Sequence, residues 1–261
     1  MPRYRLTIEY EGTRYRGWQA QKNARTVQGE CEAALRSTLA DVAFELQGSG
    51  RTDAGVHALA QVAHLELARQ VGPEKLRRDL NDLLPADIHI LEIHPAAPSF
   101  HARHHAEARS YLYQISRRRT AFGKRTVWWI KDPLDENLLR QAGASFVGMH
   151  DFRSFTDADP EETSTQVLIH DVAVVNAGAL VLIRIVASHF LWKMVRRMVG
   201  VMAEVARGSL RLEQLEDFLS EHRPEVARLT APPSGLFLER VLYPGDPPLG
   251  APQPVIVISN G

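Results

Sequence analysis

The chain has 261 residues with 31 basic and 31 acidic side chains, so its formal net charge is zero. Hydrophobic residues make up 44% of it and charged residues 24%, which is typical of a globular protein and excludes the disordered and collagen-like classes. The single cysteine, Cys31, excludes a disulfide framework and a cysteine-based zinc cluster. The N-terminus lacks the apolar core of a signal peptide, and no apolar run is long enough to span a membrane. We therefore expect a cytoplasmic protein of one large or two small domains.

Hydrophobic periodicity predicts a chain of the α+β class. In the first half we expect strands at 3–10, 42–46, 59–67 and 88–93 and helices at 27–39 and 73–84. The second half repeats the mixture, with strands at 110–116, 167–175, 180–187 and 236–242 and helices at 134–146, 190–207 and 212–220. Thr26 is placed to cap the first helix. Two subdomains joined near 95–108 are expected, and the composition of the tail from Pro244 predicts loose order.

The zero net charge hides strong clustering along the chain. Residues 1–25 carry six basic groups against two acidic, 103–131 carry eight against one, and 184–211 carry six against one. Two acidic blocks, 132–171 and 213–225, offset them. Such basic blocks can line a positive groove on a neutral molecule, or they can be solvated faces that never meet.

Residues 47–58, QGSGRTDAGVHA, form the most unusual local segment. Their three glycines predict a tight loop between two strands. No Gly-Lys-Ser/Thr follows and no helix begins there, so a phosphate-binding P-loop is excluded. Arg51 lies two residues before Asp53, and a neighbouring cation keeps a carboxylate ionised. Such a carboxylate can attack carbon or stabilise an oxocarbenium-like centre. The alternative is an ordinary turn in which Asp53 caps backbone N–H groups beside Arg51.

Two later segments carry further candidates. Tyr111 and Tyr113 lie on one face of a predicted strand, where one of them could stack on a base or accept a proton, unless both are core tyrosines. The helix at 190–207 has an apolar stripe that includes Phe190, and Arg196 lies on its opposite face with Lys193, Arg197 and Gly200. Because a glycine in mid-helix is unfavourable, Gly200 predicts the close approach of another backbone.

A cluster of histidines, His101, His104 and His105, raises the question of a metal site. The segment follows two prolines, does not have a helical pattern and has no cysteine near it. We expect histidines that face RNA or solvent and no metal.

The loop sequence GRTDAGVHA belongs to a set of characteristic segments that follow one another along the chain. They are LTIEYEGTRYRGWQAQ (6–21), TVQGECEAAL (26–35), GSGRTDAGVHALAQVAH (48–64), SFHARHHAEARSYLYQI (99–115), FVGMHDFRSF (146–155), FLWKMVRRMVG (190–200) and APPSGLFLERVLY (231–243). In this set and order the chain resembles the TruA-type tRNA pseudouridine synthases.

The resemblance implies two RRM-like (ferredoxin-like) subdomains with antiparallel sheets and an active-site cleft between them. Residues 1–104 would carry the aspartate loop, and 105–261 the active-site tyrosine and a basic helix. It implies a homodimer in which one tRNA touches both subunits, no metal and no organic cofactor. The implied reaction isomerises uridine to pseudouridine at positions 38–40 of the tRNA anticodon arm.

Carried over to this sequence, the resemblance makes Asp53 the catalytic aspartate and Arg51 the arginine of its motif. Tyr111 matches the tyrosine that packs on the base and takes a proton, and Arg196 matches the basic partner of the aspartate. Further substrate contacts are expected from apolar, histidine and basic residues: Leu236, Leu238, His57, Arg14, Arg16, Lys22, Arg25 and Arg103. One departure is His104, where the family usually has an aromatic residue, which puts the local RNA contact in doubt.

Three roles remain open for Asp53: attack at C1′, attack at C6, or removal of a sugar proton. Two other classes of protein also remain open. One is a non-catalytic RNA-binding module, although no aromatic pair typical of such a sheet is recognisable. The other is a glycosidase, for which Asp151 is the nearest second carboxylate.

Overall fold

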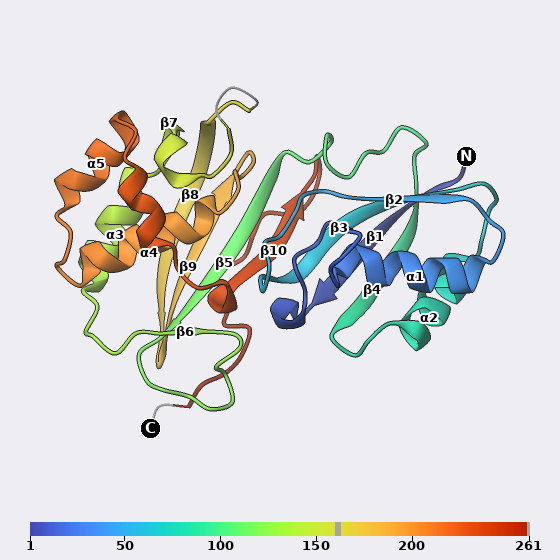
Figure 1. Cartoon of the computed structure of the whole chain (residues 1–261), viewed down its shortest axis with the longest axis horizontal. Coiled ribbons are helices and arrows are strands. Elements are labelled where there is room, and N and C mark those ends of the chain that lie inside the picture. The colour runs from blue at the N-terminus through green and yellow to red at the C-terminus, as the bar shows by residue number, and fades with distance from the viewer. Residues whose placement is uncertain (160–162, 260–261) are drawn as a thin grey trace. The chain divides into compact units, whose positions relative to one another are not determined.

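A computed structural model describes residues 1–159 and 163–259, and the chain divides into two compact units. The first unit comprises Met1–Glu107 and Phe237–Asp246. The second comprises Ala108–Leu236 and the described residues from Pro247 onward. The chain thus leaves the first unit at Glu107, builds most of the second, and returns one strand to the first (Figure 1). The boundary that the sequence predicts, after residue 104, lies three residues before the observed one. The sequence also does not predict that a later strand returns to the first unit.

The first unit is built in the order strand, helix, strand, strand, helix, strand. Its elements are β1 (Arg3–Tyr10), α1 (Val27–Leu39), β2 (Phe44–Gly48), β3 (His57–Leu67), α2 (Pro73–Leu83) and β4 (Ile88–Ala96). These strands are antiparallel in the order β4-β1-β3-β2. The returning strand β10 (Leu236–Leu242) runs parallel to β3, with Phe237 opposite His57 and Leu238 opposite Ala58.

The core of the first unit follows from alternation and capping. On β1, Tyr4, Leu6, Ile8 and Tyr10 are buried while the residues between them are less buried or exposed. Thr26 caps α1, and its hydroxyl accepts the N–H of Gly29 at 3.2 Å. The predicted alternation and the predicted cap are both confirmed.

The second unit has a sheet in the order β5-β9-β8-β7, antiparallel throughout. Its strands are β5 (Ala108–Ser116), β6 (Trp128–Trp129), which lies parallel to β5, β7 (Gly148–Asp151), β8 (Gln166–Ala177) and β9 (Leu180–Ala187). Its helices are α3 (Glu136–Ser145), α4 (Met194–Ala206) and α5 (Leu212–Ser220). Short 3₁₀ turns lie at Gly12–Arg14 in the first unit and at Arg153–Phe155, Pro224–Leu229 and Pro233–Gly235 in the second. The expected mixture of strands and helices is confirmed, although β6 and β7 were not predicted.

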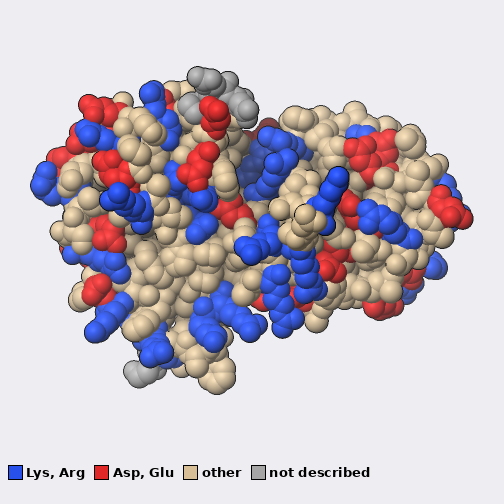
Figure 2. Space-filling model, in the orientation of Figure 1, with Lys and Arg blue, Asp and Glu red and all other residues tan. Residues whose placement is uncertain are grey.

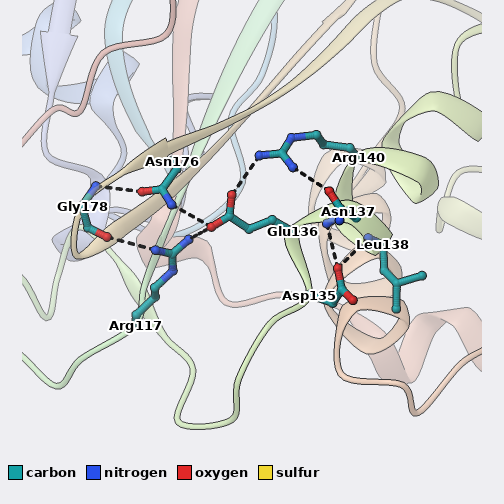
Figure 3. Close-up of polar contacts among 8 residues, drawn as sticks. All are labelled: Arg117, Asp135, Glu136, Asn137, Leu138, Arg140, Asn176 and Gly178. Atoms are coloured by element: carbon teal, nitrogen blue, oxygen red, sulfur yellow. Dashed lines mark hydrogen bonds and ion pairs between the residues drawn. The ribbon is translucent and has the colours of Figure 1, made fainter.

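A polar network joins the start of α3 to the turn between β8 and β9 (Figure 3). The Glu136 carboxylate accepts hydrogen bonds from Arg117, from Asn176 at 2.7 Å and from Arg140 at 2.8 Å. Asp135 caps the same helix by accepting the N–H groups of Asn137 and Leu138. The network therefore fixes the N-terminal end of α3 to the turn between β8 and β9.

Two expectations for the second unit are wrong. The helix predicted from Phe190 begins at Met194, because Lys193 adopts a left-handed conformation with φ of 63° and interrupts the run. Phe190 therefore lies before the helix. The tail expected to be loosely ordered packs on the second unit: the Val255 N–H donates to Gln114 Oε1 at 2.7 Å, and Ile256 and Ile258 pack against a buried cluster that includes Leu182.

The prediction for Gly200 is confirmed. A Cβ atom at this position would lie 1.6 Å from the carbonyl oxygen of Leu229, so only glycine lets the two backbones meet. Within the described ranges, every helix is too short or too polar to cross a lipid bilayer.

Candidate functional site

The loop between β2 and β3 carries Asp53 and leads into a strand, as expected, rather than into a helix. Segment 11–18 holds this loop through its backbone. The Trp18 N–H donates to the Thr52 carbonyl at 3.1 Å, and the Gly55 N–H donates to the Tyr15 carbonyl at 3.2 Å. Within the loop, the Val56 N–H donates to the Asp53 carbonyl at 3.1 Å. Asp53 itself is half-buried.

Glycines let the two segments approach this closely. Gly17 has φ of +93°, and a Cβ atom there would lie 2.4 Å from the Thr52 carbonyl oxygen. A Cβ at Gly12 would lie 1.9 Å from the carbonyl oxygen of Val56. The backbone on either side of Asp53 is therefore enclosed by contacts that a larger residue would break.

A pocket of about 490 Å³ opens beside this loop. Its lining includes Ala54 and Gly55, which directly follow Asp53, together with Arg14, Arg16 and Arg25. Three of the four basic residues that the sequence nominated between positions 14 and 25 are thus brought together; Lys22 is not part of this lining. A pocket with several guanidinium groups is suited to phosphate oxygens.

Two of these arginines are oriented by neighbouring groups. Arg25 lies over the ring of Tyr15, 4.9 Å from its centroid, and pairs with Glu30 at 2.6 Å. Arg14 lies 3.9 Å from the carboxylate of Asp87, which also accepts the Tyr15 hydroxyl. Burial, with the adjacent Asp87, raises the pKa of Tyr15, so this phenol stays neutral.

The other motif residues of the loop have different surroundings. Arg51 is exposed, and its Nε donates to Gln19 Oε1 at 3.1 Å. His57 is buried; its Nδ1 accepts the Gly12 N–H at 2.9 Å, and its ring stacks on Phe237 at 4.7 Å. These contacts give His57 a structural task, tying the 11–18 segment and β10 to the start of β3.

Tyr111 and Tyr113 differ sharply in the second unit. Tyr111 is half-buried on β5 and meets the ring of Phe190 edge-on at 4.9 Å. Tyr113 is fully buried and donates to the carbonyl of Pro232 at 2.7 Å, and burial raises its pKa well above the usual range. Tyr113 is a core tyrosine, and Tyr111 is the less buried of the two.

The two arginines of α4 also differ. Arg196 is half-buried and donates from Nε to the Ala231 carbonyl at 2.7 Å, which fixes its stem. Arg197 is buried and pairs with Asp157, which also binds Lys193 at 2.6 Å. We expected both arginines on the polar face of α4, but only Arg196 is partly exposed, and Arg197 is buried in the second unit.

The apolar and histidine candidates lie as follows. Leu236 and Leu238 are buried in β10. Arg103 is exposed in a turn with His101 and His104, whose rings lie 4.2 Å apart. In the same turn the Ala102 N–H donates to Nδ1 of the buried His64 at 3.2 Å. Across the described residues, no three metal-binding side chains converge on a point.

Two buried polar groups of the first unit escaped the sequence analysis. His64 was hidden among the mostly apolar residues of β3, and the structure connects it to the histidine turn through the Ala102 N–H and a ring contact of 4.6 Å with His101. Tyr10 ends the strand predicted at 3–10, and its hydroxyl lies 2.8 Å from Thr52 Oγ1. No pattern in the sequence pairs residues that are 42 positions apart.

Asp151 lacks the properties of a glycosidase acid. Its partial burial raises its pKa, but hydrogen bonds from Arg153 and Thr165 outweigh burial, and the net pKa is lowered. A general acid in a glycosidase needs a raised pKa, so Asp151 is an ionised structural carboxylate.

Charged groups are distributed unevenly over the second unit. On the face turned to the viewer in Figure 2, Lys and Arg gather over the loops beside β6, while acidic and basic groups alternate over α3 and α5. The loops around β6 belong to the basic block 103–131 and carry Arg118, Arg119, Lys124 and Arg125.

Comparison with known proteins adds the following. The sequence model of the family described as tRNA pseudouridine synthase matches residues 6–105 and 142–244. A protein named tRNA pseudouridine synthase A from Nitrobacter winogradskyi is 41% identical over 252 residues, which are 95% of this chain and 98% of that protein. Proteins of the same name from Nitrobacter hamburgensis and Rhizobium meliloti are 42% and 39% identical, each over 93% of this chain and 100% of its own length. A solved Cbf5-Nop10-Gar1 complex contains a chain that aligns with 12% identity and a TM-score of 0.34, covering 76% of this chain and 53% of that one, a similarity too low to assign a shared fold.

Proposed function

The chain belongs to the family of tRNA pseudouridine synthases, and on this premise we propose that it isomerises uridine at positions 38–40 of the tRNA anticodon arm, with Asp53 as the catalytic residue. Members of this family are isomerases that act on tRNA. The isomerisation breaks the N1–C1′ bond, turns the base, and joins C5 to C1′. The hydrogen at C5 leaves as a proton, and N1 gains one.

One observation carries the assignment of Asp53: its loop is held by the 11–18 segment and borders a pocket lined by Arg14, Arg16 and Arg25. A target uridine has to leave the base stack before any side chain can reach its glycosidic bond. Guanidinium groups beside the loop can hold the phosphates that flank such a nucleotide, and a fixed backbone keeps the carboxylate aimed at it. Phosphate contacts position RNA without reading its sequence. We propose such phosphate contacts for Arg14, Arg16 and Arg25, with Arg103 and Lys22 as further candidates.

The second unit supplies the remaining groups of the proposal. Tyr111, the less buried of the two tyrosines of β5, can stack on the displaced base and so recover part of the unstacking cost, and its hydroxyl can take up the C5 proton. Arg196, fixed by its hydrogen bond to Ala231, is the proposed partner of the aspartate, together with Arg51. Leu236 and Leu238 are proposed as the apolar floor beneath the base.

The topology of each unit supports the RRM-like subdomains that the resemblance implies. The first unit has the order of elements and the sheet order β4-β1-β3-β2 of a ferredoxin-like fold. In the second unit, β5, β8 and β9 with α3 and α4 follow the same succession. We also propose a homodimer in which both subunits touch the tRNA, and a cytoplasmic location, where the substrate is found.

The assignment of Asp53 is tested by tritium release from tRNA labelled at uridine C5. Asp53→Asn preserves the shape of the side chain and removes its charge, so we expect turnover below about a thousandth of wild type. The matched control is Asp79→Asn on α2, where the carboxylate pairs with Lys75 on the surface, and it should keep wild-type turnover. Turnover by a folded Asp53→Asn above about a thousandth of wild type contradicts the assignment. Anticodon-arm RNAs with a single uridine at position 38, 39 or 40 test the proposed target.

A further inference from the structure

We propose that four buried polar side chains, Tyr10, Ser49, Thr52 and Gln61, act as positioning residues that set the conformation of the loop carrying Asp53. We refer to them as the loop-anchoring network. The inference rests on the proposed function, because it gives these residues a role in aiming the proposed catalytic carboxylate.

The network joins the loop to two neighbouring strands of the first unit. The Tyr10 hydroxyl, at the end of β1, lies 2.8 Å from Thr52 Oγ1. Gln61, on β3, accepts the Ser49 hydroxyl at 2.8 Å and donates from Nε2 to the Gly50 carbonyl at 3.1 Å. Both ends of the segment 49–52 are therefore attached to the sheet through side chains.

These polar groups are out of contact with solvent. Their exposed fractions run from 0% at Gln61 to 6% at Thr52. Burying a polar group is unfavourable unless it is hydrogen-bonded, and the side chains of the network are hydrogen-bonded to one another. A satisfied buried network specifies one arrangement of the groups it joins. Here the groups it joins are the residues that lead up to Asp53.

Thr52 belongs to the loop-anchoring network and is also held by a backbone hydrogen bond from segment 11–18. Its hydroxyl is bound by Tyr10, while its carbonyl oxygen accepts the Trp18 N–H and packs against Gly17. Thr52 is thus fixed through both side chain and backbone, and Asp53 is the next residue. A shift of Thr52 displaces the carboxylate, and a displacement of about 1 Å at a reacting group costs roughly 100-fold in rate.

The inference predicts an effect on turnover that is separate from stability. Tyr10→Phe removes only the hydroxyl, and we expect kcat to fall about 10–100-fold with KM within about threefold of wild type. Thr52→Val should behave alike, whereas Thr52→Ser keeps the hydroxyl and should stay within about threefold of wild-type kcat. The Thr52 pair also tests the inference if Tyr10→Phe does not fold.

Tyr4→Phe is the matched control. Tyr4 lies on the same strand, is equally buried, and its hydroxyl donates to the Val71 carbonyl at 2.9 Å, away from the loop. It should lower the thermal unfolding midpoint about as much as Tyr10→Phe and leave kcat within about twofold of wild type. Asp53→Asn is assayed in the same series.

The outcomes separate the two proposals. A loss of kcat in Tyr10→Phe and Thr52→Val that is absent from Tyr4→Phe and Thr52→Ser supports the inference. If Asp53→Asn is inactive but Tyr10→Phe and Tyr4→Phe have equal kcat, the positioning role is wrong while the proposed function stands. If a folded Asp53→Asn turns over at the wild-type rate, the catalytic assignment of Asp53 is wrong and the positioning role falls with it, whereas absence of tritium release by the wild type would show that the proposed function is wrong.

Discussion

His64 lies inside the first unit, 3% exposed, with Nδ1 accepting the N–H of Ala102. A nitrogen that accepts a hydrogen bond carries no proton, so this geometry requires the neutral ring. Burial, together with the nearby His101 and Arg3, lowers the pKa of His64 to about 4 despite the opposing charges of Glu45 and Glu66. The turn that carries Arg103 is therefore attached to β3 by a histidine that resists protonation.

This histidine should make stability depend on pH. In the unfolded chain its pKa is about 6.5, so the unfolded state binds the proton first. The stabilisation is complete above about pH 6.5, is lost as the pH falls from 6.5 toward 4, and reaches about 3 kcal/mol in total. We expect His64→Asn, whose amide oxygen can accept the Ala102 N–H, to reduce the fall in the free energy of unfolding between pH 7.5 and 4.5, measured in urea.

The control is His89→Asn, an exposed histidine on β4, which should show the wild-type fall. An equal fall in His64→Asn and the wild type would show that another group carries the dependence.

At the scale of elements, Glu136 illustrates how a single side chain orders a helix and a turn together. Glu136 is the first residue of α3. Its carboxylate accepts hydrogen bonds from Arg117, in the segment after β5, and from Asn176, near the end of β8 (Figure 3). Asn176 in turn accepts the Gly178 N–H at 3.0 Å, so the turn into β9 depends on the same group.

Glu136→Ala should lower the free energy of unfolding by about 1–2 kcal/mol, because charged hydrogen bonds to two elements are lost. Part of any such loss comes from removing a negative charge at a helix N-terminus. Glu213→Ala, in the first turn of α5 and exposed, measures that part alone and should cost less than about 1 kcal/mol. If Glu136→Ala and Glu213→Ala lowered the free energy of unfolding in urea equally, the hydrogen bonds of Glu136 to Arg117 and Asn176 would contribute nothing.

The same scale shows what the sequence could predict. The periodicity located α5 and β10 with their observed bounds, because their apolar spacing is regular and both segments end in breaks of pattern. The periodicity missed β6 and β7, because strands of two and four residues are too short to show a period. It began α4 too early, because nothing in the segment FLWK indicates a left-handed Lys193. The motif located the aspartate loop, but the contact of Tyr10 with Thr52 depends on strand register, which a single sequence does not display.

At the scale of the whole molecule, the C-terminal segment completes the core of the second unit. Arg184 donates to the Gly250 carbonyl, and Val255, Ile256 and Ile258 cover a cluster of Leu112, Val127, Leu180 and Leu182. Composition suggested a loose tail because prolines and glycines dominate its first half, and the apolar run at 255–258 was too short to outweigh them. The tail is a structural part of the unit that it follows.

Two neighbouring residues test this packing. Ile256→Ser should lower the free energy of unfolding by about 2 kcal/mol, because a half-buried apolar side chain is replaced by a hydroxyl. Val257→Ser, at a position that is 90% exposed, should change it by less than about 0.5 kcal/mol. Both are measured by urea unfolding at pH 7.5, and similar values for the two variants would contradict the packing.

The return of β10 to the first unit has a consequence for synthesis on the ribosome. Phe237, which stacks on His57, is added roughly 130 residues after the chain has left this unit at Glu107. At about 5–20 residues per second, the ribosome needs roughly 6–26 s for that stretch. During this interval the start of β3 lacks its parallel neighbour. The unit that carries Asp53 thus lacks one of its strands throughout this interval, and the start of β3 reaches its final surroundings only after Phe237 has been added.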